Sequence, residues 1–120
     1  MNFLIVDDDP HVLSAIAELV MSARPDAHVT TARSAREGFE QLDQNGFDFV
    51  ITDVVMESPD AGWQIARAAQ TRGIAVLLVS SDDRAPAGET ARGFALVQKS
   101  ELTRSKLADF VTGVLATTPI

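Results

Sequence analysis

Short apolar runs alternate with amphipathic stretches along this chain, and that alternation constrains the fold more than any other feature. A continuous apolar run of a few residues is typical of a strand buried on both faces of a sheet. Strands that alternate with helices predict a parallel sheet covered by helices on both faces, with right-handed crossovers. The predicted strands are residues 3–6, 27–31, 47–52, 74–79 and 94–97.

Capping signals and helical periodicity place the helices between these strands. Asp9 is a candidate N-cap with Pro10 at the first helical position, and the segment from Ser34 to Glu37 matches a capping box. Two further helices are predicted over residues 62–72 and 102–116, where apolar residues recur at helical spacing.

The segment between the fourth and fifth predicted strands is poorly patterned. It contains Pro86, Gly88 and Gly93, which are unfavourable residues inside a helix. The helix expected between these strands is therefore predicted to be short, displaced or replaced by a loop.

Composition excludes several classes of protein. The 120 residues fit one domain, residues 1–120, and 46% hydrophobic residues suffice for one core. The absence of cysteine excludes disulfides and thiol catalysis and agrees with a reducing cytosol. A formal charge of −7 disfavours direct binding to nucleic acid, which usually requires a basic surface. With no basic leader at the start and no apolar run of membrane-spanning length, we expect a cytoplasmic location and no membrane contact.

Polar residues whose side chains can take part in a reaction or bind a ligand follow four of the predicted strands. Asp7 and Asp8 follow the first, Asp53 the third, Ser80 the fourth and Lys99 the fifth. Ligands of open α/β sheets bind outside the carboxyl ends of the strands. If the strand order is 2-1-3-4-5, all five residues converge on one edge of the sheet.

Three neighbouring carboxylates repel one another and favour a bound cation. Hard oxygen ligands at this density suit Mg²⁺, which could also neutralise an incoming phosphoryl group. Phosphoryl transfer depends mainly on positioning and charge stabilisation, and a carboxylate can itself accept the phosphoryl group. A hydroxyl and an ammonium would then hydrogen-bond the phosphoryl oxygens.

These motifs, in this order, resemble the receiver domain of bacterial two-component response regulators over essentially the whole chain. The acidic pair stands in Phe-Leu-Ile-Val-Asp-Asp, Asp53 closes Asp-Phe-Val-Ile-Thr-Asp, and Ser80 lies in Leu-Leu-Val-Ser-Ser. The resemblance implies a flavodoxin-like three-layer sandwich with a five-stranded parallel sheet in the order 2-1-3-4-5. It also implies a switch rather than an enzyme. The switch would take a phosphoryl group from a histidine kinase or histidine phosphotransfer protein and signal to a downstream protein.

The resemblance also implies roles for individual residues around a Mg²⁺ cofactor. Asp53 would be the phosphoacceptor and a metal ligand. Asp8 would bind the metal directly, Asp7 would act largely through water, and Val55 would offer its backbone carbonyl.

Two strand-end residues would contact the phosphoryl group, and two departures from the family pattern lie near them. Ser80 would supply the switch hydroxyl and Lys99 the phosphate-binding ammonium. Ser100 follows Lys99 where the family usually has proline, so the peptide between them is predicted to be trans, because a cis bond at serine costs roughly 2.5–4 kcal/mol. Leu96 occupies the usual aromatic position. Together with the irregular fourth helix, this predicts a monomer without the usual dimer surface.

Two other interpretations remain open at this stage. A small phosphatase of the haloacid dehalogenase type would use Asp7 as its nucleophile, although its Asp-x-Asp-x-Thr/Val motif fits residues 7–11 poorly. A degenerate receiver would bind partners without phosphorylation, which the intact acidic residues and Lys99 argue against. The start and the short tail favour a single-domain regulator over an excised fragment.

Overall fold

A mostly parallel sheet forms the middle layer of the molecule. The computed structural model describes residues 1–56, 60–80, 90–91 and 94–117. The sheet has the order β2-β1-β3-β4-β6-β5. Its strands are β1 (Asn2–Val6), β2 (His28–Ala32), β3 (Phe49–Asp53), β4 (Ala75–Ser80), β5 (Thr90–Ala91) and β6 (Phe94–Gln98). All neighbouring pairs are parallel except β5 with β6, so the predicted five-stranded parallel sheet in the order 2-1-3-4-5 is confirmed, with β6 as its fifth strand.

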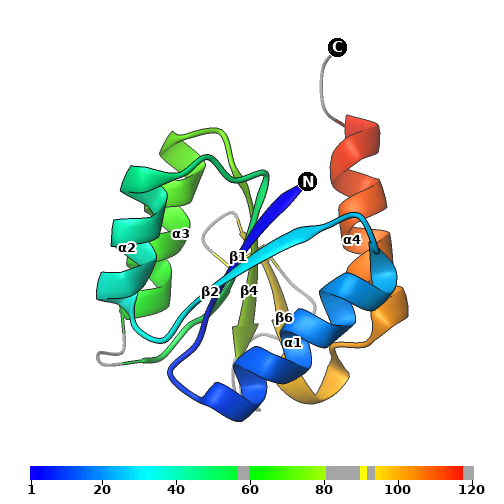
Figure 1. Cartoon of the computed structure of the whole chain (residues 1–120), viewed down its shortest axis with the longest axis horizontal. Coiled ribbons are helices and arrows are strands. Elements are labelled where there is room, and N and C mark those ends of the chain that lie inside the picture. Colours follow the sequence, from blue (N-terminus) through cyan, green and yellow to red (C-terminus); the bar gives the residue numbers. More distant parts are fainter. Residues whose placement is uncertain (57–59, 81–89, 92–93, 118–120) are drawn as a thin grey trace.

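Helices cover both faces of this sheet (Figure 1). On one face lie α1 (Pro10–Ala23) and α4 (Arg104–Thr117), and on the other lie α2 (Ala35–Gln44) and α3 (Ala61–Thr71). The last helix begins two residues later than predicted, because a 3₁₀ turn over Lys99–Glu101 precedes it. Within the described ranges, no helix has both the length and the apolar character needed to span a membrane.

The region before β6 is only partly described. The prediction of a short, displaced or absent fourth helix concerns residues 81–93, of which only Thr90 and Ala91 are among the described residues. These two residues form β5, an edge strand that the sequence analysis did not predict. The peptide bond between Lys99 and Ser100 is trans, as predicted, and no described residue has a cis peptide bond.

The core lies on both sides of the sheet because side chains of a strand alternate between its faces. In β1, Leu4 and Val6 pack under α2 and α3, whereas Phe3 and Ile5 pack under α1 and α4. Phe3 also stacks on Phe49 of β3, with ring centroids 4.8 Å apart. Burial on both faces explains why these strands read as continuous apolar runs.

The predicted caps of α1 and α2 are confirmed, with one local difference. The Asp9 carboxylate accepts a hydrogen bond from the His11 amide at 2.9 Å, and the Ser34 hydroxyl accepts one from the Glu37 amide at 3.1 Å. The Glu37 carboxylate accepts from the Arg33 amide, one residue before the position expected in a standard capping box. These caps set where α1 and α2 begin and hold the loops that follow β1 and β2.

Candidate functional site

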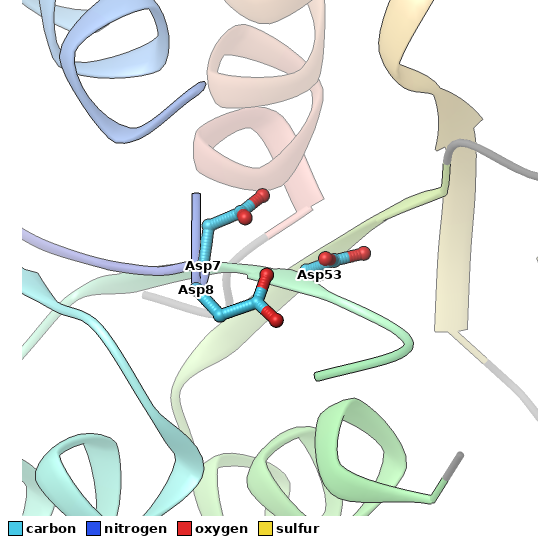
Figure 2. Close-up of side chains that lie close together, drawn as sticks. All are labelled: Asp7, Asp8 and Asp53. Carbon is cyan, nitrogen blue, oxygen red and sulfur yellow. The ribbon is translucent and has the colours of Figure 1, made fainter. Parts of the chain in front are cut away.

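Three carboxylates gather at the carboxyl ends of two neighbouring strands. Asp7 and Asp8 follow β1, and Asp53 is the last residue of β3. Val6 pairs with Thr52 across these strands, so the next position along each strand brings Asp7 beside Asp53. Figure 2 shows the three side chains close together, and one oxygen of each carboxylate lies within 4.8 Å of the other two. The predicted convergence of these aspartates is therefore present in the structure.

Asp7 is completely buried, so its charge needs partners. Its Oδ1 accepts a hydrogen bond from the Asp9 amide at 2.9 Å. Its Oδ2 forms an ion pair with Lys99 Nζ at 2.9 Å. A carboxylate oxygen has two lone pairs, so Oδ2 can still accept a further donor or bind a cation.

Lys99 bridges the two buried carboxylates. It follows β6, and its preceding residue Gln98 pairs with Ser80 at the end of β4. Its Nζ donates a hydrogen bond to Asp53 Oδ2 at 3.1 Å while contacting Asp7. Burial alone lowers the pKa of Lys99, but the contacts and charges of the two aspartates outweigh this effect and raise it above the usual value. The ammonium therefore stays charged at neutral pH.

Asp53 is an unusually basic carboxylate. It is 4% exposed, and removal from water is the largest cause that raises its pKa from 3.8 to about 6. The charge of Asp7 raises the pKa further, Lys99 opposes both effects, and Asp8 adds a smaller increase. An ionised Asp53 at neutral pH is therefore poorly solvated, and an added cation would relieve this cost.

Ser80 and Val55 lie near this cluster. Ser80 is buried, and because Asp53 pairs with Val79, it stands one position beyond the direct neighbour of Asp53. Val55 follows β3 and is 53% exposed. The predicted phosphoryl contact of Ser80 and the predicted metal-binding carbonyl of Val55 stay predictions.

The residues of the cluster fit a hydrated Mg²⁺ ion. Three carboxylates and one ammonium leave two negative charges, which a divalent cation neutralises. Mg²⁺ prefers oxygen ligands and keeps several waters. Asp8 is exposed and so can meet a partly hydrated ion, while Asp7 Oδ2 supplies a buried oxygen with a second lone pair beside Lys99.

Two contacts at this site were not predicted from the sequence. The first is the ion pair between Lys99 and Asp7, because Lys99 was expected to act on a phosphoryl group. The second involves Gly62 in α3, whose amide donates to the Val54 carbonyl at 2.9 Å and whose Cα lies against the Asp53 carbonyl. The sequence did carry a signal for this second contact, namely a glycine in the first turn of a helix. Glycine at such a position often marks a place where another segment of backbone comes close.

Comparisons with known proteins agree with this fold and this site. The family model described as "Response regulator receiver domain" matches residues 3–101. A curated rice protein from Oryza sativa subsp. indica, "Two-component response regulator ORR21", is 33% identical over 86 residues. This match covers 70% of the chain but only 12% of the rice protein.

Solved structures share the same architecture. A response regulator receiver domain protein from Clostridium thermocellum has a TM-score of 0.73 and 25% identity, over 96% of this chain and 94% of that one. The response regulator TrrA from Thermotoga maritima, in complex with Mg²⁺ and BeF, has a TM-score of 0.77 and 19% identity, over 94% and 97%. The chain belongs to the response regulator receiver domain family of two-component systems.

Proposed function

We propose that this chain is a phosphorylation switch in which Asp53 accepts a phosphoryl group in the presence of Mg²⁺. The donor is a histidine kinase or a histidine phosphotransfer protein, and the phosphorylated chain changes conformation to signal to a protein partner. One observation carries the proposal: the buried Asp53 carboxylate shares Lys99 with Asp7 and lies beside Asp8. The Mg²⁺ and BeF held by the related TrrA structure support the same chemistry.

The transfer step follows from the chemistry of a carboxylate and a phosphohistidine. An Asp53 oxygen attacks phosphorus, and the new O–P bond forms as the N–P bond of the donor breaks. The electron pair of that bond returns to the imidazole nitrogen, and Asp53 becomes an acyl phosphate. When bound by Asp7, Asp8, Asp53 and the Val55 carbonyl, Mg²⁺ supplies positive charge next to the phosphoryl oxygens.

Lys99 and Ser80 couple this step to the rest of the fold. When Asp53 is phosphorylated, its carboxylate is no longer an ion-pair partner of the Lys99 ammonium, and the phosphoryl oxygens take its place. The ion pair between Lys99 and Asp7 remains. Ser80, at the end of the next strand, supplies a hydroxyl that can donate one hydrogen bond to a phosphoryl oxygen. Movement of these two groups toward the phosphoryl group is the proposed signal.

Family membership favours this function over a phosphatase of the haloacid dehalogenase type. Such an enzyme would use Asp7 as its nucleophile. Asp7 is fully buried, and its two oxygens already contact the Asp9 amide and Lys99. The complete set of acidic residues with Lys99 also disfavours a degenerate receiver.

The test is the intact mass of the protein after incubation with acetyl phosphate and Mg²⁺. We expect one added phosphoryl group, lost in Asp53→Asn and in excess chelator. Asp109→Asn is the matched control, because Asp109 is exposed on α4. Labelling that survives Asp53→Asn but is lost in Asp7→Asn would assign the nucleophile to Asp7 instead.

Three expectations go with this proposal. We expect residues 1–120 to act as one receiver domain, to remain monomeric and to work in the cytoplasm. Sedimentation with and without beryllofluoride tests the monomer, and a phosphorylation-dependent dimer would contradict it.

A further inference from the structure

The start of α3 presses against the backbone of Asp53. Gly62 is the second residue of α3 and is buried. Its amide is one of those at a helix start that lack an intrahelical partner, and it donates to the Val54 carbonyl at 2.9 Å. A Cβ at Gly62 would lie 1.9 Å from the Asp53 carbonyl oxygen and 2.5 Å from Val54 Cα. Because both neighbours are backbone atoms, only glycine permits this approach.

The same stretch of backbone is held from two other sides. The Thr52 hydroxyl donates to the Asp53 carbonyl at 3.0 Å, and Thr52 is completely buried. The Val54 amide donates to the Val79 carbonyl of β4 at 3.1 Å. These contacts restrain the backbone that carries the Asp53 side chain and leads directly to Val55.

We propose that Gly62 and Thr52 are positioning residues that set the affinity of the Asp7, Asp8 and Asp53 cluster for a divalent cation. The inference rests on the proposed function, which assigns Mg²⁺ to this cluster. Mg²⁺ demands near-ideal octahedral geometry, so its affinity depends on where the ligand-bearing backbone lies. Changing groups that orient metal ligands typically weakens binding about 10–100-fold.

Gly113 provides a matched control for the substitution Gly62→Ala. A Cβ at Gly113 in α4 would meet nothing within 4 Å, so Gly113→Ala tests the substitution alone. Gly38 is unsuitable as a control, because a Cβ there would lie 3.2 Å from the side chain of Val6, the residue before Asp7.

The experiment is a calorimetric titration of each 120-residue variant with MgCl₂, without a phosphodonor. We expect the Mg²⁺ dissociation constant of Gly62→Ala to rise about tenfold or more, with Gly113→Ala within about twofold of wild type. A purely structural role for Gly62 would lower stability without changing Mg²⁺ affinity.

Thr52→Val provides a second arm because it removes the hydroxyl without adding bulk. We expect it to unfold cooperatively in urea and to bind Mg²⁺ at least about threefold more weakly. If Gly62→Ala does not fold, this variant decides the question. If either folded variant binds Mg²⁺ with the affinity of the wild type, the inference is wrong and the proposed function is unaffected. If the wild-type protein does not bind Mg²⁺, the proposed function is contradicted as well.

Discussion

Replacing Asp53 by asparagine should make the metal-free protein more stable at neutral and alkaline pH. The folded protein holds this carboxylate almost out of water and beside the charge of Asp7, so its pKa rises from 3.8 to about 6. Lys99 offsets only part of that cost. Asparagine has nearly the same shape and carries no charge, so the variant removes the unfavourable ionisation and keeps the packing.

The sign and size of the effect follow from proton linkage. The folded protein binds the Asp53 proton more tightly than the unfolded chain, so stability is greatest below pH 3.8 and is lost as pH rises through about 6. Each pKa unit corresponds to about 1.4 kcal/mol, which gives a full cost of about 3 kcal/mol. The gain of Asp53→Asn should therefore be about 3 kcal/mol at pH 8 and only about 1 kcal/mol at pH 4.5.

Urea unfolding in EDTA measures this difference through the fluorescence of Trp63. Trp63 is the only tryptophan in the sequence and is half-buried, with its ring centroid 6.4 Å from that of Phe94. Asp109→Asn, on an exposed position, should change stability by less than about 0.5 kcal/mol. An Asp53→Asn variant that is equally stable or less stable than wild type at pH 8 would refute the electrostatic reasoning.

Magnesium should remove most of this difference in stability between Asp53→Asn and wild type. If Mg²⁺ binds at the carboxylate cluster, a concentration 100 times its dissociation constant stabilises the wild type by about 2.7 kcal/mol. Asp53→Asn lacks one ligand and should gain much less. Equal stabilisation of both proteins by Mg²⁺ would place the cation elsewhere.

Three further predictions concern single side chains. Lys99→Ala leaves two buried carboxylates without their shared partner and should cost about 3 kcal/mol of stability in EDTA, partly restored by Mg²⁺; unchanged urea midpoints would contradict this. Ser80→Ala should still be labelled on Asp53 by acetyl phosphate but should lose most of the amide NMR shifts that beryllofluoride causes in wild type, and identical shifts would remove Ser80 from the switch. Asp9→Ala removes the N-cap of α1 and should cost about 1 kcal/mol, whereas Asp109→Asn in the same urea assay should show no such loss.

Much of the fold could be predicted because its information is local. A strand buried on both faces needs a continuous apolar run, and a helix start needs side chains such as Asp9 and Ser34 that accept its free amides. Parallel strands end at one edge of their sheet, so residues that follow them must gather there. For this reason the sequence alone placed Asp7, Asp8 and Asp53 at one edge of the sheet, and the strand order 2-1-3-4-5 implied by the family resemblance then predicted that they converge.

Other features depend on which helices and strands lie next to one another, and the hydrophobic periodicity of the sequence does not show this. The order of the strands came from a family resemblance, and the structure then showed β6 beside β4, which brings Lys99 from 46 residues away onto Asp53. The antiparallel strand β5 was missed because two residues are too short to carry a pattern.

The electrostatics and close contacts of the site were decided only by tertiary structure. Asp7 and Asp8 are adjacent in sequence and chemically identical, yet one is fully buried and the other exposed. Asp7 lies beside Asp53 and contacts Lys99, whereas Asp8 lies in the turn between β1 and α1. Gly62 has a role only because α3 packs directly on the end of β3. Burial and packing set the pKa of Asp53 and the freedom of its backbone, and both arise from contacts between segments that are distant along the chain.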